Sequence, residues 1–280
     1  MKRRIFMIVV AAVLVFGMLL GCTATTNTPK STAAPTTGQS SLPSSQPTQG
    51  VLKVGIDDTY PPMEFTDESG NTVGFDIDMA NEIGKRLNMK VEFIPTVWEG
   101  IFAALDSDKF DCIISSLSIT DERKKTILFS QPYIANAQVI VVPTSNETIK
   151  VPADLAGKKV GVQSGTTAQA SGEKFNATTP FESFDTYPSV VSPFEDMKIG
   201  RLDAIIVDGV VALDYVNKYP NDYKFSGIKL DPEPIGIGFK LSNTALKDKI
   251  DPLITAMKKD GTLVAFSQKW FKDDFITSVK

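Results

Sequence analysis

Histidine is absent from this chain of 280 residues, and cysteine occurs only twice. The absence of histidine excludes catalytic triads built on histidine and removes the commonest zinc ligand. Apart from Cys22, which lies near the N-terminus, only Cys112 remains, so we expect no internal disulfide and a fold held by hydrophobic burial. Cys112 lies in the apolar run Phe110–Ile114, which indicates an inert core residue rather than a nucleophile.

An excess of positive charge is also missing. The first 21 residues contain three basic and no acidic side chains, so the rest of the chain has a net charge near −7, which is −4 minus 3. Nucleic-acid-binding proteins have a basic surface instead, and we expect no nucleic-acid partner. The chain also lacks a polybasic segment that would indicate binding to a lipid surface.

The N-terminus has the three parts of a secretory signal. The basic residues Lys2–Arg4 precede an uncharged apolar run, Ile5–Leu20, and the small residue Gly21 follows. We therefore predict that residues 1–21 are a signal peptide. One alternative is an uncleaved membrane anchor, because the run is only slightly shorter than the roughly 20 residues of a membrane span. The other is a twin-arginine signal at Arg3-Arg4.

The sequence Leu19-Leu20-Gly21-Cys22 resembles the lipobox of bacterial lipoproteins. This resemblance implies cleavage before Cys22 and a lipid on its sulfur, and so an extracytoplasmic protein anchored to the cell membrane. Residues 22–50 consist almost entirely of Thr, Ser, Pro, Ala, Gln and Gly. Such a segment buries too little apolar surface to offset the entropy lost on ordering. We predict a disordered tether here rather than an ordered N-terminal domain.

The part expected to fold begins at Val51 and has about 230 residues, enough for one large or two modest domains. Short apolar runs alternate with helical patterns, which is typical of an α/β fold with a mostly parallel sheet and helices on both faces. The predicted strands are Val51–Ile56, Val91–Ile94, Asp111–Ser115, Gln138–Val142, Val160–Val162, Ala204–Val207 and Ile235–Phe239. The predicted helices are Ile77–Leu87, Trp98–Asp106, Asp121–Leu128, Thr167–Lys174, Pro193–Ile199, Val210–Asn217, Ala245–Lys259 and Leu263–Phe271.

Local sequence signals refine these predictions. Ser192–Glu195 matches a capping box with proline at the first helical position. Glu68–Asn71 indicates a tight turn between two strands. Pro252 lies inside the predicted helix Ala245–Lys259, so we expect this helix to kink or restart there.

Several motifs follow one another in an order typical of a known family. They are Val54–Phe65, Gly74–Ala80, Ser115–Lys125, Phe129–Tyr133, Lys258–Thr262 and Lys269–Phe271. Together they resemble the polar-amino-acid solute-binding proteins of bacterial ABC importers, and the similarity covers Val51–Phe271. The resemblance implies the type II periplasmic-binding-protein fold, in which two α/β lobes joined by two crossing strands enclose the ligand.

The resemblance also implies where the lobes divide. Residues 51–141 and 235–280 would form lobe one, and residues 142–234 would form lobe two. The crossing strands are expected near Gln138–Val142 and Gly236–Phe239. This arrangement agrees with the tendency of α/β sheets to bind ligands beyond the carboxyl ends of their strands.

A free amino acid has a carboxylate and an ammonium group, so its site needs one fixed cation and one fixed anion. Arg123 is the candidate cation. We expect Thr120 to cap a helix that begins at Asp121, where free N–H groups add donors and the guanidinium can bind a carboxylate through two bonds. Asp208 is the candidate anion, because it follows the buried strand Ala204–Val207. The family resemblance supports both roles; without it, Arg123 would be read as a surface arginine and Asp208 as a helix cap.

The resemblance assigns further residues to the ligand. The polar residues expected to complete the shell around it are Ser116, Ser118, Thr166 and Thr167. The aromatic residues Tyr60 and Trp98 would form walls against an alkyl stem or a guanidinium. For Trp98 the alternative is simple packing against a helix.

The side-chain end of the ligand is expected at Asp57, a position that faces that end in the family. A carboxylate there suits a guanidinium, an ammonium or an amide donor. Ser115 would lie beside it, and Ser115–Ser118 resembles the binders of histidine and of lysine, arginine and ornithine. Val162–Thr167, which includes Gln163, resembles arginine and cystine binders instead. A basic ligand is favoured, arginine first, and glutamine, histidine and cystine stay open.

We therefore expect a monomeric solute-binding protein that delivers a polar, basic amino acid to the permease of an ABC importer. No catalytic residue, cofactor or metal is expected. Cyclic acid dehydratases resemble these binders, but they need a general acid in the cleft, and Asp57 and Asp208 already have binding roles in the family pattern. A sensory ectodomain is the other alternative, and it normally precedes a transmembrane helix and a signalling domain.

Overall fold

The computed structural model describes residues 50–276. The predicted signal peptide, Cys22 and the predicted tether up to residue 49 lie outside the described residues. Within residues 50–276, no helix combines the length and the apolar character needed to cross a membrane.

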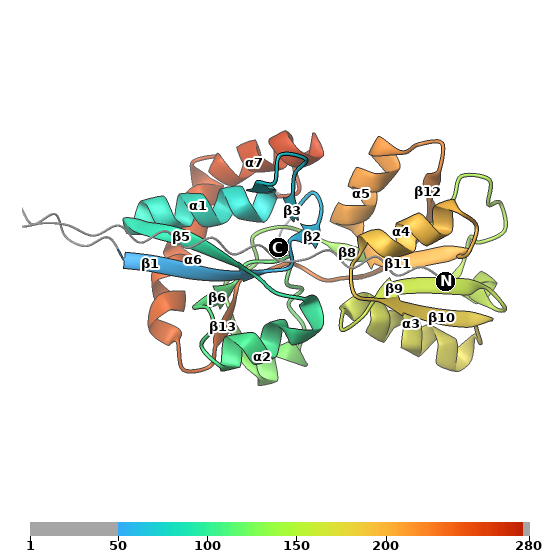
Figure 1. The fold of residues 1–280 in the computed structure, drawn as a ribbon, viewed down its shortest axis with the longest axis horizontal. Coiled ribbons are helices and arrows are strands. Elements are labelled where there is room, and N and C mark those ends of the chain that lie inside the picture. Colours follow the sequence, from blue (N-terminus) through green and yellow to red (C-terminus); the bar gives the residue numbers. More distant parts are fainter. Residues whose placement is uncertain (1–49, 277–280) are drawn as a thin grey trace, which may run out of the picture. The chain divides into compact units, whose positions relative to one another are not determined.

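Two five-stranded sheets organise the described residues (Figure 1). The first has the order β5 (Met89–Pro95), β1 (Gly50–Ile56), β6 (Cys112–Ile113), β13 (Gly238–Lys240) and β7 (Ile127–Phe129). The second has the order β10 (Ser183–Tyr187), β9 (Lys159–Gln163), β11 (Ala204–Asp208), β8 (Ala137–Pro143) and β12 (Tyr223–Pro232). We call the part of the chain around the first sheet lobe one and the part around the second lobe two.

The predicted α/β fold is confirmed, but each sheet is more mixed than expected. Three neighbouring strands of each sheet run parallel, whereas β13 and β8 run antiparallel to both of their neighbours. β8 follows β7 of the other sheet, and β13 follows β12 of the other sheet. Each of these two strands enters from the side at which the parallel strands end, so it runs in the opposite direction.

Helices cover both faces of each sheet. The first sheet packs against α1 (Phe75–Leu87), α2 (Ile101–Asp106) and α6 (Thr244–Lys259), and α7 (Thr262–Phe271) packs on α1 and α6. The second sheet packs against α3 (Thr167–Thr178), α4 (Val191–Lys198) and α5 (Gly209–Lys218). Short 3₁₀ turns occur at η1 (Trp98–Gly100), η2 (Arg123–Lys125) and η3 (Pro152–Leu155). Cys112 is fully buried and burial raises the pKa of its thiol, which confirms it as a core residue.

A small antiparallel sheet lies at the start of lobe one. It consists of β2 (Thr59–Tyr60), β3 (Glu64–Thr66) and β4 (Thr72–Val73). The turn between β3 and β4 has Gly70 at φ 82°, so the predicted tight turn is confirmed. Tyr60 and Glu64 are cross-strand partners in this sheet, so their side chains lie on the same face.

Two local predictions were wrong, and one of the two alternatives in a third did not occur. The segment Asp121–Leu128 is not a helix but η2 followed by β7, because Ile127 and Phe129 are buried and pair with β13 whereas most of the preceding turn is exposed. Ser192 is not a helix cap: α4 begins at Val191, whose N–H donates to Ser189 Oγ at 3.1 Å. The helix α6 does not restart at Pro252, because the proline is exposed and the carbonyl it leaves unpaired can face water.

The two lobes are joined by two neighbouring chain segments. Ile235 N donates to Ile134 O at 3.1 Å, and Glu233 N donates to Asn136 O at 2.9 Å. Because β8 pairs within the second sheet from Ala137 onwards, we place the first crossing segment at Ile134–Asn136, a few residues before the expected one. The second crossing segment is Glu233–Ile235, which also lies just before the expected one, because Gly238 and Phe239 already pair within the first sheet.

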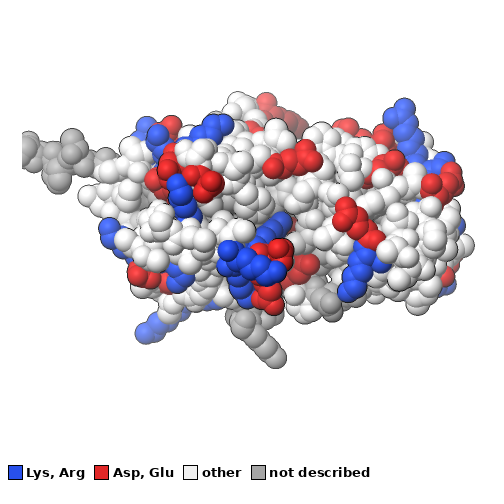
Figure 2. Space-filling model, turned by 90° about the horizontal axis from the view of Figure 1, so that it is seen from below, with Lys and Arg blue, Asp and Glu red and all other residues white. Residues whose placement is uncertain are grey.

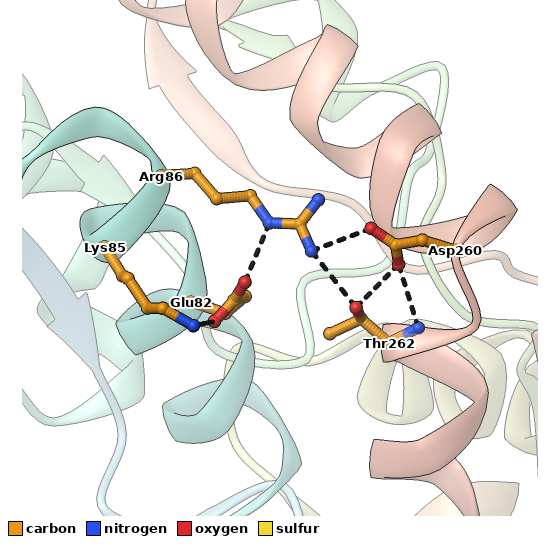
Figure 3. Close-up of polar contacts among 5 residues, drawn as sticks. All are labelled: Glu82, Lys85, Arg86, Asp260 and Thr262. Atoms are coloured by element: carbon orange, nitrogen blue, oxygen red, sulfur yellow. Dashed lines mark hydrogen bonds and ion pairs between the residues drawn. The ribbon is translucent and has the colours of Figure 1, made fainter.

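A polar cluster on lobe one ties α1 to the junction of α6 and α7 (Figure 3). Arg86 Nε donates to Glu82 Oε1 at 2.8 Å, and its Nη2 donates to Asp260 Oδ2 at 2.9 Å and to Thr262 Oγ1 at 3.1 Å. Elsewhere on the surface, acidic and basic side chains are interspersed over the face in Figure 2.

Candidate ligand-binding site

A cavity lies between the lobes. It is lined by Tyr60, Glu64, Trp98, Ser115, Ser116, Ser118, Arg123, Gln163, Thr166, Thr167 and Asp208. The structure therefore brings together all of the predicted site residues except Asp57, and it adds Glu64. Within residues 50–276, no group of three or more Cys, Asp or Glu side chains could bind a metal ion.

Arg123 contributes an unpaired cation to this cavity. Its Nη1 donates to Ser118 O at 3.0 Å, and its guanidinium lies 5.5 Å from the ring centre of Trp98 and 5.4 Å from that of Phe102. No ion pair of Arg123 with a carboxylate within 4.0 Å occurs among the described residues. Burial lowers the pKa of Arg123, and the charges of Asp208 and Glu233 oppose that effect.

The backbone around Arg123 differs from the prediction. Arg123 N donates to Thr120 Oγ1 at 3.1 Å, so Thr120 does cap this turn. The turn η2 has only three residues, however, and β7 follows it. The expected N-terminal donors of an α-helix are therefore not available, and the guanidinium itself is the main donor.

Asp208 provides the opposite charge from lobe two. It stands directly before α5, yet its side chain makes no capping hydrogen bond to that helix. Its Oδ1 accepts from Asn136 Nδ2 at 2.5 Å and from Gln138 Nε2 at 2.6 Å, and its Oδ2 accepts from Tyr60 Oη. Burial raises the pKa of Asp208, and these hydrogen bonds oppose the rise. The carboxylate of Asp208 is thus turned away from α5 and toward the cavity. The alternative interpretation of Asp208 as a plain helix cap does not explain this orientation.

Two aromatic side chains of lobe one reach across to lobe two. Tyr60 Oη donates to Asp208, and Trp98 Nε1 donates to the carbonyl oxygen of Gly165 at 3.0 Å. Both rings are buried. Since each ring bonds to the opposite lobe, the structure has the lobes closed on each other.

The serines after β6 lie at the base of the cavity in lobe one. Ser116 adopts a left-handed backbone conformation with φ 43°, and its N–H donates to Asp76 Oδ2 at 2.7 Å. The buried Ser116 Oγ has no hydrogen-bond partner among the described residues. A buried hydroxyl without a partner carries a desolvation cost, which a polar ligand can remove.

Asp57 lies just behind the cavity wall and is already hydrogen-bonded. Its Oδ2 accepts from Gln163 Nε2 at 2.7 Å, and its Oδ1 accepts from Thr59 Oγ1 at 2.7 Å. Its backbone N–H donates to Ser115 Oγ at 2.9 Å. Gln163 therefore stands between Asp57 and the cavity, at a junction of the two lobes.

Glu64 is the lining residue that the sequence reasoning missed. It is fully buried, its Oε1 accepts from Ser115 Oγ at 2.7 Å, and its Oε2 has no partner among the described residues. Burial, and then the neighbouring Asp76, raise the pKa of Glu64 well above its usual range. The signal was present in the motif Val54–Phe65, because a tight hairpin that places Tyr60 at the ligand also places Glu64 there.

The two threonines at the start of α3 differ in availability. Thr166 Oγ1 caps the helix by accepting from Gln169 N at 3.2 Å and donates to Gln163 O at 2.7 Å. Thr167 Oγ1 accepts from Gln138 Nε2 at 3.0 Å. The hydroxyl of Thr166 is thus committed to the backbone, whereas Thr167 keeps a proton to donate.

Comparison with known proteins agrees with this architecture. The family model for bacterial extracellular solute-binding proteins, family 3, matches residues 52–273. The L-cystine-binding protein TcyJ of Escherichia coli is 37% identical over 227 residues, which cover 81% of this chain and 84% of TcyJ. The histidine-binding periplasmic protein of Salmonella typhimurium is 33% identical over 230 residues, covering 80% of this chain and 88% of that protein.

Solved structures show the same fold. An ancestral arginine-binding protein bound to arginine is 43% identical, with a TM-score of 0.76, over 80% of this chain and 99% of that one. A substrate-binding protein from Streptococcus pneumoniae with bound histidine is 30% identical, with a TM-score of 0.76, over 81% of this chain and 95% of that one. These structures are two-lobed, as are residues 50–276 here. The chain belongs to the bacterial extracellular solute-binding proteins of family 3.

Proposed function

We propose that this protein is the extracytoplasmic binding component of an ABC importer and captures a free amino acid between its lobes. The observation that supports this most is Arg123, a half-buried guanidinium in the cavity wall without a carboxylate partner among the described residues. A charge that is partly withdrawn from water is costly unless it is paired. A ligand carboxylate would supply the missing partner.

The zwitterion would lie between Arg123 and Asp208, which line the same cavity from opposite lobes. Arg123 would bind the carboxylate, helped by Ser118 and Thr167, and Asp208 would bind the ammonium. Trp98 and Tyr60 would flank the ligand. Charge-assisted hydrogen bonds contribute roughly 1.5–3 kcal/mol each, so a few of them are enough for micromolar affinity, about −8 kcal/mol.

The side-chain end of the ligand would meet Glu64, Ser115 and Gln163, and Asp57 would act on it through its hydrogen bond with Gln163. The carboxylate of Asp57 behind that end favours a basic ligand, and arginine is the first candidate. A relative, the arginine-binding protein 1 of Escherichia coli, is 31% identical over 224 residues. The ancestral protein named above has also been solved with glutamine, and glutamine, histidine and cystine are the alternatives.

The mechanism we infer is closure about the two crossing segments. The ligand would shift the equilibrium toward the closed form by its greater affinity for that form. The bonds Tyr60–Asp208, Trp98–Gly165 and Gln163–Asp57 join the lobes in that form. A closed, loaded protein is the form that would dock on the permease.

The N-terminal residues would determine where the protein is located. Residues 1–21 would direct export, a lipid on Cys22 would anchor the chain, and residues 22–50 would tether the binding lobes at a distance on the order of 30 Å from the membrane. We propose a monomer in this setting, since one chain supplies both halves of the site.

A thermal-shift panel tests the proposal. The purified protein would be unfolded and refolded to remove bound ligand, and then mixed with the common amino acids, ornithine, citrulline, cystine and prephenate. A ligand at about 100 times its Kd should add roughly 2.7 kcal/mol of stability. We expect the largest shift with arginine and smaller shifts with lysine and ornithine.

The other outcomes separate the parts of the proposal. A shift only with glutamine, histidine or cystine would keep the amino-acid binder and refute the basic ligand. No shift with any amino acid would refute the zwitterion site, and a shift with prephenate alone would favour a dehydratase-like enzyme.

A further inference from the structure

Gln138 is a buried glutamine that does not line the cavity but contacts two residues that do. It is the second residue of β8, directly after the first crossing segment, and its exposed fraction is 1%. In the sheet register it stands opposite Asp208 on the neighbouring strand β11, and Figure 1 shows these strands side by side. Directly opposed residues have their side chains on the same face.

The amide nitrogen of Gln138 serves several acceptors. Its Nε2 lies 2.6 Å from Asp208 Oδ1, 3.0 Å from Thr167 Oγ1 and 3.3 Å from Glu233 Oε2. An amide nitrogen has only two hydrogens, so the two shorter contacts take them. A carboxylate can only accept, so the nitrogen side of the amide must face Asp208, which fixes the orientation of the group.

This orientation determines what Thr167 can do. A hydroxyl that accepts from Gln138 retains one hydrogen to donate. Among the described residues no acceptor of that hydrogen is found, and Thr167 lines the cavity. The hydrogen is therefore free to point at an acceptor inside the cavity.

We propose that Gln138 is a positioning residue that prepares both ends of the lobe-two half of the site. It holds the Asp208 carboxylate toward the ammonium of the ligand, and it directs the Thr167 hydroxyl as a donor toward the ligand carboxylate. This inference rests on the proposed function. Because Gln138 is the second residue of β8 and lies close to the first crossing segment, its contacts also tie this half of the site to the chain that bends on closure.

The test uses Gln138→Met, which keeps the length of the side chain and removes its donors. Three ligands would be compared by titration calorimetry on the full chain: L-arginine, 5-guanidinopentanoate, which lacks the ammonium, and agmatine, which lacks the carboxylate. We expect the Kd for arginine to rise at least tenfold. Each analogue should lose less, because it lacks one of the two groups that Gln138 serves.

Two further variants sharpen the test. In a Thr167→Val background, Gln138→Met should leave the Kd for 5-guanidinopentanoate within about twofold, because neither function of Gln138 remains for that ligand. Gln131→Met is the matched control: Gln131 bonds to Asp251 and Thr255 of α6, away from the cavity, and arginine binding should not change. If Gln138→Met does not fold, Gln138→Leu takes its place.

An equal loss with all three ligands, or no loss with arginine, would overturn the positioning role. Failure of the wild-type protein to bind any amino acid would instead refute the proposed function, so the two failures are distinct. Should the panel rank glutamine or histidine first, the amino acid and its deaminated and decarboxylated analogues replace the arginine series.

Discussion

The two lobes contribute opposite charges to the cavity, and they treat those charges differently. In lobe one, Arg123 has a single hydrogen bond from its guanidinium, to the carbonyl oxygen of Ser118, and no ion pair among the described residues. In lobe two, Asp208 accepts three hydrogen bonds, two of them from amides of its own side of the site. The cation is exposed to the ligand, whereas the anion is already solvated by the protein.

This difference predicts which lobe the ligand contacts first. A carboxylate gains most where a charge lacks a partner, so the ligand should attach first to lobe one. The ammonium then has to share Asp208 with Tyr60, the one donor to it that comes from lobe one. The Tyr60–Asp208 bond thus links closure of the lobes to the group that binds the ammonium.

Removing the unpaired cation should have the largest effect. Arg123→Ala is expected to raise the Kd of the cognate amino acid by a factor of about 100 or more, because two charge-assisted bonds of roughly 1.5–3 kcal/mol each are lost. Without ligand, the variant should be no less stable than the wild type, since a half-buried charge without a carboxylate partner has been removed. Titration calorimetry and urea unfolding measure these quantities.

Lys124→Ala is the matched control for this change. Lys124 lies in the same turn but is exposed and paired with Asp121 at 3.0 Å, and its loss should leave the Kd unchanged. Binding by Arg123→Ala within tenfold of the wild type would show that the ligand carboxylate binds elsewhere.

Removing the hydroxyl of Tyr60 should have a moderate effect and tests the link between the lobes. Tyr60→Phe keeps the aromatic wall but leaves Asp208 with only the donors of Asn136 and Gln138. We expect the ligand-free protein to be more open, seen as a larger radius of gyration in solution scattering, and the Kd to rise about three- to tenfold.

Tyr215→Phe controls for loss of a phenol as such. Its ring stacks on Phe194 within lobe two at 3.7 Å between centroids, away from the cavity lining, and we expect no change in either measurement. An unchanged radius of gyration in Tyr60→Phe would mean that the Tyr60–Asp208 bond does not contribute to closure.

The comparison also shows what the sequence could predict. The alternating strands and helices followed from apolar patterns, but strands whose pattern is weak were missed. β10 is half-buried along most of its length, and β12 contains register shifts against β8, so neither has a clear period of two. The segment Asp121–Leu128 was assigned to a helix because the contacts of β7 with β13 come from residues more than a hundred positions away.

The residues of the site also divide into those that the sequence could predict and those that it could not. Arg123 and Asp208 were found because a zwitterion needs two charges and the motif positions supplied them. Glu64 and Gln138 were not found, because their roles depend on contacts across strands: Tyr60 with Glu64 in the small hairpin, and Asp208 with Gln138 in the second sheet. Such contacts depend on register, which a single sequence specifies only weakly.

The smallest expected effect concerns buried carboxyl groups, which the lobes again accommodate differently. Asp208 in lobe two has three donors, whereas lobe one has the neighbouring pair Glu64 and Asp76, and Glu64 accepts only from Ser115. Burial raises the pKa of Asp76 to about 7, although hydrogen bonds from Ser116 N and Tyr133 Oη lower it. Both carboxyls of this pair therefore hold protons more tightly in the folded protein than in the unfolded chain.

A carboxyl whose pKa is raised by folding stabilises the protein below its unfolded pKa, and this contribution is lost as the pH rises through the folded value, here about 7 for Asp76. The ligand-free protein should therefore lose stability between pH 5 and pH 7.5, on the order of 2 kcal/mol in urea unfolding. Asp76→Asn should flatten this slope, and Asp248→Asn, an exposed change on α6, should leave it as it is. An unchanged slope in Asp76→Asn would mean that the pH dependence arises elsewhere, and Asp208→Asn would then show whether lobe two is its source.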